Sequence, residues 1–240
     1  MSEPLGVLFI HGMRTSNAIW ESQLAAVRAL GYQALAIDLP AHGEFSAERF
    51  SFAGSFETIK RALADLGRPT VIVGLSLGGY VALAYTAKYP NTNIIGVVAA
   101  GCATETKWKP LRWYAHIAAV AHAVICFAAK QIRRILKKSS LKQLPPWQIV
   151  TDALGELSGH SEIADIRAID VPIWFINGAR DPLRIQAKKF AEIAKDGVAI
   201  TIPHAGHDVN TDAPTAFNEI LSNALCRIAV SSIAPPPRGP

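Results

Sequence analysis

Apolar residues follow two different spacings along this chain, and the two spacings predict strands that alternate with helices. Short unbroken apolar runs are typical of parallel strands buried on both faces, whereas apolar positions three or four residues apart indicate amphipathic helices. The unbroken runs predict strands at residues 5–10, 34–37, 70–73, 94–100, 171–176 and 198–202. The helical spacing predicts helices at residues 18–30, 56–66, 77–89 and 214–230.

This alternation predicts an α/β fold: a doubly wound, mainly parallel sheet of about six strands with helices on both faces. The alternation stops near residue 102, after the fourth strand, and resumes near residue 166. We therefore expect a core formed by residues 1–101 and 166–230, with a helical insertion at residues 102–165. Residues 231–240 are rich in proline, and we expect them to form a disordered tail.

The composition is that of a single globular domain with a large core. Of the 240 residues, 50% are apolar and 18% are charged, which excludes disordered, collagen-like and coiled-coil classes. The first residues lack the basic and apolar regions of a secretory signal. Cys102, Cys126 and Cys226 are odd in number and far apart, so we expect reduced thiols and a cytoplasmic protein.

The net charge of +5 comes from one segment of the chain. No acidic residue occurs between positions 107 and 142, and the remainder of the chain is mildly acidic. Three interpretations stay open: a solvated face of the insertion, attraction to an anionic membrane surface, or attraction to an anionic substrate. Nucleic acid is not expected, because the segment carries no recognisable binding module. The basic residues are Lys107, Lys109, Arg112, Lys130, Arg133, Arg134, Lys137, Lys138 and Lys142.

The longest apolar run, residues 113–129, does not predict a transmembrane helix. It is interrupted by His116 and His122, and it does not exceed the roughly 20 residues that are needed to span a bilayer.

The strongest chemical signal is the segment Gly-Leu-Ser-Leu-Gly at residues 74–78, between a predicted strand and a predicted helix. A serine at the tip of such a sharp turn needs small residues two positions before and after it, and Gly74 and Gly78 meet that need. The turn exposes the Ser76 hydroxyl beside a helix N-terminus that favours negative charge. Ser76 is therefore a candidate nucleophile; the alternative is a serine that only caps the helix.

A serine nucleophile needs a base, and the base needs an acid that orients it. His207 follows the last predicted strand and is the favoured base, with His204 as its competitor. Asp181 follows the strand at residues 171–176 and is the candidate acid; its alternative role is a helix cap before Pro182. Because carboxyl ends of parallel strands meet at one end of a sheet, we expect the three candidates to lie together.

With the elbow and these two residues in the order Ser76, Asp181, His207, the chain resembles the α/β-hydrolase family over residues 5–101 and 166–228. His11-Gly12-Met13 is similar to the oxyanion loop of that family. The resemblance implies an oxyanion hole formed by the backbone N–H groups of Met13 and Leu77. We assign no chemistry to His11. Antiparallel strands that often come first in the family are not expected here.

The expected insertion occupies the place where the family commonly carries a helical lid over the active site. Its apolar residues suit a lid on a hydrophobic pocket, or they pack only within the lid. Candidate pocket residues are Trp108, Trp113, Tyr114 and Trp147. We expect no metal and no other cofactor, because metal-ligand clusters and phosphate loops do not occur in the sequence.

By this resemblance the chain is expected to be a serine hydrolase, a carboxylesterase or small lipase that acts on a small hydrophobic ester. Serine at the elbow argues for acyl transfer to water. The fold hosts other chemistries, however. A carbon–carbon hydrolase, a lactonase, a haloperoxidase-like enzyme and a non-catalytic ligand-binding protein remain alternatives.

Overall fold

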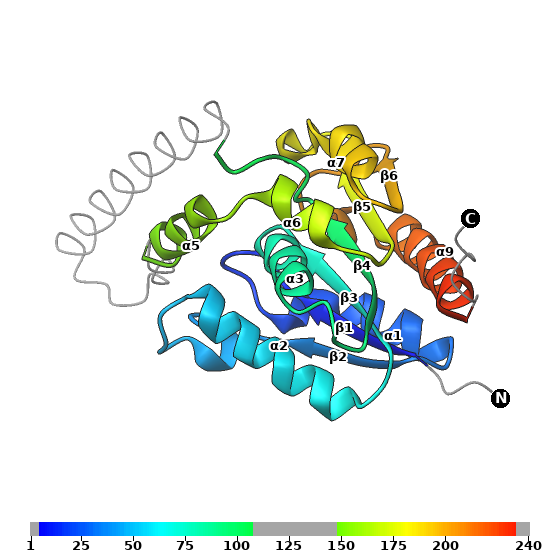
Figure 1. The fold of residues 1–240 in the computed structure, drawn as a ribbon, viewed down its shortest axis with the longest axis horizontal. Helices are drawn as coiled ribbons and strands as arrows, with labels where there is room; N and C mark the ends of the chain where they lie inside the picture. The colour runs from blue at the N-terminus through cyan, green and yellow to red at the C-terminus, as the bar shows by residue number, and fades with distance from the viewer. Residues whose placement is uncertain (1–4, 108–147, 234–240) are drawn as a thin grey trace, which may run out of the picture.

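The computed structural model describes residues 5–107 and 148–233, and its centre is a six-stranded parallel sheet (Figure 1). The strands lie in the order β2-β1-β3-β4-β5-β6. β1 is paired with both β2 and β3, so the strand order reverses there, and ligands of open α/β sheets bind at such a point beyond the carboxyl ends of the strands. The strands are β1 (Gly6–Ile10), β2 (Gln33–Ile37), β3 (Thr70–Leu75), β4 (Ile94–Ala100), β5 (Ile173–Gly178) and β6 (Gly197–Ile202).

Helices cover both faces of the sheet, as Figure 1 shows. One face carries α1 (Glu21–Ala29) and α9 (Pro214–Ile233), and the opposite face carries the helices between them in sequence except α8. The helices on the opposite face are α2 (Phe52–Leu66), α3 (Leu77–Lys88), α5 (Gln148–Gly159), α6 (Glu162–Ala168) and α7 (Ala187–Ile193). The short helix α8 (Val209–Asp212) lies on the side of α1 and α9. Three 3-10 turns complete the described part: η1 (Asn17–Trp20), η2 (Gly43–Phe45) and η3 (Pro182–Arg184).

The predicted fold class is confirmed. The differences concern the ends of some helices and two short helices, α7 and α8, that were not predicted. The predicted helix at residues 18–30 is split into η1 and α1, and α2 begins before residue 56 because the Ser51 hydroxyl accepts a hydrogen bond from the Gly54 N–H at 3.1 Å. α7 was not predicted, since its seven residues bury only Ala187 and Phe190 and show no clear periodicity. α9 runs to Ile233, three residues into the expected tail.

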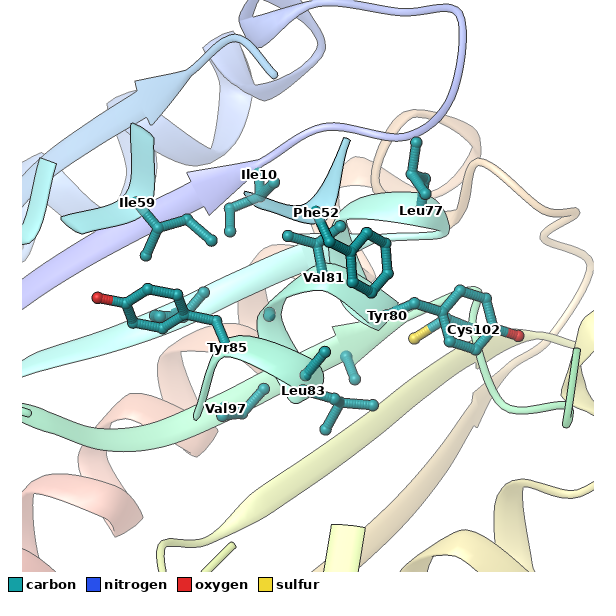
Figure 2. Packing of buried hydrophobic residues seen from close by; sticks show 14 of the residues in the cluster. Ile10, Phe52, Ile59, Leu77, Tyr80, Val81, Leu83, Tyr85, Val97 and Cys102 are labelled. Carbon is teal, nitrogen blue, oxygen red and sulfur yellow. The ribbon is translucent and has the colours of Figure 1, made fainter. Parts of the chain in front are cut away.

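The alternating side chains of the strands build one core layer on each face of the sheet. Val7, Phe9 and Trp174 pack against α1 and α9, whereas Leu8 and Phe175 pack on the other side. Figure 2 shows part of this second layer, where side chains of α3 are packed among those of neighbouring elements. α3 is buried along almost its whole length, so its N-terminus is held firmly at the carboxyl end of the sheet.

The described ends of the expected insertion are fastened to the core. Thr106 and Glu162 lie at its two ends, and the buried Glu162 carboxylate accepts hydrogen bonds from the Thr106 N–H, at 3.1 Å, and from the Thr106 hydroxyl. α5 packs its apolar side into the core, and its Glu156 carboxylate accepts a hydrogen bond from the Phe52 N–H at 2.8 Å. The chain thus leaves the core and returns to it at neighbouring points.

Several predicted features lie outside the described residues. These are the four aromatic pocket candidates Trp108, Trp113, Tyr114 and Trp147, and the basic segment apart from Lys107. Among the helices that the structure describes, none combines the length and the apolar character required to cross a membrane.

Candidate active site

Ser76 lies at a sharp turn between β3 and α3, as the sequence predicts. Its backbone has φ 52° and ψ −115°, a conformation that residues other than glycine rarely adopt. The Ser76 N–H donates a hydrogen bond to the Ala100 carbonyl at 2.7 Å, which fastens the turn to β4. The strained turn therefore presents the Ser76 hydroxyl beyond the end of the sheet.

Glycine is required on both sides of this turn because backbone atoms approach too closely for a side chain. A Cβ atom at Gly74 would lie 2.3 Å from the Gly78 carbonyl oxygen. A Cβ atom at Gly78 would lie 2.3 Å from the Ile10 carbonyl oxygen. The two glycines thus allow α3 to start directly against the ends of β3 and β1.

His207 lies in the loop after β6 and reaches both other candidates. Its Nε2 is 2.8 Å from Ser76 Oγ, and its Nδ1 is 3.1 Å from Asp181 Oδ1. The competitor His204 is exposed, and no hydrogen bond of its side chain is found within the described part. The structure therefore brings His207, and not His204, to the serine.

Asp181 is buried, with 2% of its surface exposed, and both roles considered for it occur together. Its Oδ1 faces His207 and also accepts a hydrogen bond from the Leu183 N–H at 2.9 Å, which caps η3. The cap orients the carboxylate and does not compete with the histidine. Glu105, another acid after a strand, is instead paired with Lys189 at 2.6 Å.

Charge around the imidazole favours its protonated form. Burial lowers the pKa of His207, but the hydrogen bond to Asp181 and the charges of Asp181, Asp208 and Asp212 outweigh burial and raise the pKa above its usual value. A base of this kind accepts a proton readily and is stabilised as imidazolium by a carboxylate that stays in place.

Two backbone N–H groups beside Ser76 are available for an anion. Leu77 is the first residue of α3, and its N–H has no acceptor within the described residues, as is usual in the first helical turn. Met13 follows Gly12, where an added Cβ would lie 3.4 Å from Ser76 Cβ; the Met13 N–H also has no acceptor in the same part of the chain. Both predicted donors thus lie on segments that flank the serine.

Two buried histidines fix the loop that carries Met13. The Leu39 N–H donates to His11 Nε2 at 3.0 Å, so the ring proton is on Nδ1 and is donated to the Gly12 carbonyl at 2.7 Å. His42 accepts from the Arg14 N–H at 3.0 Å in the same manner. Burial lowers the pKa of His11 to about 4 and also lowers the pKa of His42. Both rings are therefore neutral, and their role is structural.

Sequence reasoning missed two residues that lie next to this arrangement, Tyr80 and Thr104. The Tyr80 hydroxyl donates to the Thr104 carbonyl at 2.7 Å, and the Thr104 hydroxyl donates to the Leu183 carbonyl at 2.8 Å. Thr104 follows β4 and so lies at the same end of the sheet as the candidates. Its position after a strand was the available signal, but a threonine there carries no chemistry of its own.

Metal-ligating side chains do not gather in groups of three or more anywhere in residues 5–107 and 148–233. The groups that the structure brings together at this end of the sheet are the Ser76 hydroxyl, the His207 imidazole and the buried Asp181 carboxylate, beside the segments that carry the Met13 and Leu77 N–H groups.

Comparisons with known proteins agree with this architecture. The family model described as "Alpha/beta hydrolase family" matches residues 7–220. The chain is 24% identical over 257 residues to the 2-succinyl-6-hydroxy-2,4-cyclohexadiene-1-carboxylate synthase of Enterobacter sp. (strain 638), covering 95% of this chain and 93% of the relative. It is 26% identical over 254 residues to an esterase of Mycobacterium tuberculosis, covering 91% of this chain and 82% of that protein.

A solved structure of similar fold is the bromoperoxidase from Bacillus anthracis, with a TM-score of 0.75 and 21% sequence identity. The match covers 92% of each chain. At this identity the likeness concerns the fold alone.

Proposed function

The chain belongs to the alpha/beta hydrolase family, and we propose that it is a serine hydrolase that cleaves esters through an acyl-enzyme intermediate. One observation carries the proposal: His207 lies within hydrogen-bond distance of both Ser76 and Asp181, at 2.8 Å and 3.1 Å. In the proposed roles Ser76 is the nucleophile, His207 the general base and Asp181 the orienting acid.

The positions of these atoms support the following acylation step. Ser76 Oγ attacks the ester carbonyl carbon while His207 Nε2 takes the hydroxyl proton, and the carbonyl oxygen becomes negative. The N–H groups of Met13 and Leu77 stabilise this oxyanion, a contribution of about 3 kcal/mol for one such donor. When the tetrahedral intermediate collapses, the bond to the alkoxy group breaks, and the leaving alcohol takes the proton from His207.

Deacylation repeats the sequence with water as the nucleophile. His207 Nε2 removes a proton from the water as its oxygen attacks the acyl carbon, and the same two N–H groups stabilise the second oxyanion. Collapse breaks the bond to Ser76 Oγ, which recovers its proton from His207, and the carboxylic acid leaves. Asp181 stays ionised throughout and stabilises the imidazolium at each stage.

Labelling with a fluorophosphonate probe tests the proposal. We expect the wild-type protein to be labelled at Ser76, and we expect Ser76→Ala to remain unlabelled. A wild-type protein that is folded but not labelled would point to a ligand-binding role without catalysis. A panel of neutral esters, lactones, thioesters and amides then identifies the bond; we expect hydrophobic esters to be turned over fastest.

A second candidate is a reaction other than ester hydrolysis that uses the same three side chains. The observation that favours it is the alignment, over nearly the full length of both chains, with a relative that is named a synthase. Labelling of Ser76 without turnover of any member of the panel would favour this candidate over an esterase.

A further inference from the structure

A hydrogen-bonded connection links the acid loop to the nucleophile helix without passing through His207. The connection starts at Leu183, whose N–H donates to Asp181 Oδ1 at 2.9 Å. The Leu183 carbonyl accepts a hydrogen bond from the Thr104 hydroxyl at 2.8 Å. The N–H and the carbonyl of Leu183 thus join Asp181 to the segment after β4.

The connection continues from Thr104 to the serine. The Thr104 carbonyl accepts a hydrogen bond from the Tyr80 hydroxyl at 2.7 Å, and the Tyr80 N–H donates to the Ser76 carbonyl at 3.1 Å in the first turn of α3. Together with the two bonds of His207, these contacts form a closed ring of hydrogen bonds. Thr104 takes part through two groups, its hydroxyl and its carbonyl, and it is the member of the ring that lies on the segment after β4.

Because Thr104 and Tyr80 are buried, their hydrogen bonds favour a single arrangement of the surrounding segments. Thr104 is 1% exposed and Tyr80 is 5% exposed, so water does not replace a lost partner without cost. Figure 2 shows Tyr80 packed beside Cys102, which follows Gly101 at the end of β4. The ring therefore spans four parts of the chain that meet at the carboxyl end of the sheet: α3, the segment after β4, the loop after β5 and the loop after β6.

We propose that Thr104 is a positioning residue, which sets the distance between the acid loop and the nucleophile helix and so keeps the Asp181 carboxylate in line with His207. The proposal rests on the proposed function for its effect on rate. Its effect on the geometry of His207 does not depend on that function. Misplacement of a reacting group by about 1 Å is sufficient to lower a rate by about a hundredfold.

The test replaces the Thr104 hydroxyl by a methyl group of similar size. In Thr104→Val the hydrogen bond to Leu183 is lost, so we expect Ser76 to react with a fluorophosphonate about tenfold more slowly or worse. Asp181 would hold His207 less well, so the pKa of His207, followed by NMR of the labelled imidazole, should move to lower pH. Thr104→Ser keeps the hydroxyl and should restore both values.

Thr86→Val is the matched control. Thr86 is also buried, and its hydroxyl also donates to a backbone carbonyl at 2.8 Å, that of Ala82, but it lies farther along α3 and outside the ring. We expect this variant to change the melting temperature without changing the labelling rate or the titration. The groups whose charge acts on His207 are Asp181, Asp208 and Asp212, and all of them are retained in each variant.

The outcomes separate the positioning role from the proposed function. If Thr104→Val is labelled at the wild-type rate with an unchanged His207 titration, the positioning role is wrong. If the wild type is not labelled at all, the hydrolase proposal fails, and the NMR titration alone decides the role of Thr104. If Thr104→Val does not fold, Tyr80→Phe removes the neighbouring bond of the ring and must shift the same two measurements in the same direction.

Discussion

The two ends of the sheet use backbone strain differently. At the carboxyl end, four residues other than glycine have positive φ: Arg14, Ala41, Ser76 and His204, which follow β1, β2, β3 and β6. At the amino end, the positive-φ positions of the described chain are Gly31 and Gly67, which join helices to β2 and β3. Glycine adopts this conformation at little cost, whereas other residues do so only when their surroundings hold them.

The molecule therefore accepts a cost in stability at the carboxyl end of the sheet. The amino end makes its turns with the residue that tolerates them. The carboxyl end keeps side chains in strained positions, and it also holds buried polar atoms that lack a partner within the described residues, such as Asp181 Oδ2 and both polar atoms of Asn177. Strain and unpaired polar atoms gather where the candidate site lies.

The largest expected effect is at Ser76, where strain and chemistry coincide. Ser76→Ala should abolish the burst of acyl-enzyme and lower turnover of an activated ester by about a thousandfold or more. Ser76→Gly should lose as much activity, but its free energy of unfolding should be about 1 kcal/mol higher than that of Ser76→Ala, because glycine adopts the positive φ without strain. Denaturant titration of both variants measures this difference. Equal free energies of unfolding would show that the backbone of Ser76 is not strained.

The acid should matter almost as much as the nucleophile. Asp181→Asn retains the shape of the side chain but cannot stabilise an imidazolium, and its amide favours the wrong tautomer of His207. We expect a loss of several orders of magnitude in kcat with the fold preserved by circular dichroism. An undiminished rate would transfer the role to another carboxylate, although Glu105 is already paired with Lys189.

Of the two histidines after β6, His204 has the strained backbone and His207 has the proposed catalytic role, so their variants separate the two effects. His207→Ala should be nearly inactive, because Ser76 loses its base. His204→Ala should keep most of its activity, since the His204 side chain is exposed and makes none of the hydrogen bonds that are found for Ser76, Asp181 and His207 within the described residues. Steady-state kinetics of the two variants decides between them, and the reverse result would make His204 the base.

Acid should act on activity and on stability in separate pH ranges. Activity should fall as the pH drops through the raised pKa of His207, because the protonated ring cannot accept the serine proton. His11 has a folded-state pKa of about 4, below its usual value, so its contribution to stability is present above about pH 6.5 and is lost as the pH falls to 4. That loss amounts to about 3 kcal/mol.

Profiles of kcat/KM against pH and urea titrations between pH 7 and pH 4.5 measure the two effects. Activity that falls only together with the unfolding transition would contradict the assignment of the acid limb to His207.

The smallest expected effect is at the amino end of the sheet. Gly31 has φ 87° with no atom within 4 Å of an added Cβ, so Gly31→Ala meets only conformational cost. We expect a loss of about 1 kcal/mol in the free energy of unfolding and unchanged kinetics. A change in kcat would show that the two ends of the sheet are not independent.

Much of the fold follows from the sequence because its signals are local. Each of the six strands is an apolar run, and Gly74 and Gly78 mark the turn at Ser76. The expected meeting of Ser76, His207 and Asp181 followed from the rule that parallel strands end together. α7 and the role of Thr104 did not follow. A seven-residue helix that buries only two residues is too short to give a clear periodic signal, and the partners of Thr104 are 24 and 79 residues away along the chain.

The bonds between Thr106 and Glu162 also bear on how such a protein can diverge. Because the Thr106 N–H and hydroxyl both donate to the buried Glu162 carboxylate, the points at which the chain leaves and rejoins the core are held together by described residues alone. We therefore expect a change in length confined to residues 108–147 to leave Ser76, Asp181 and His207 where they are.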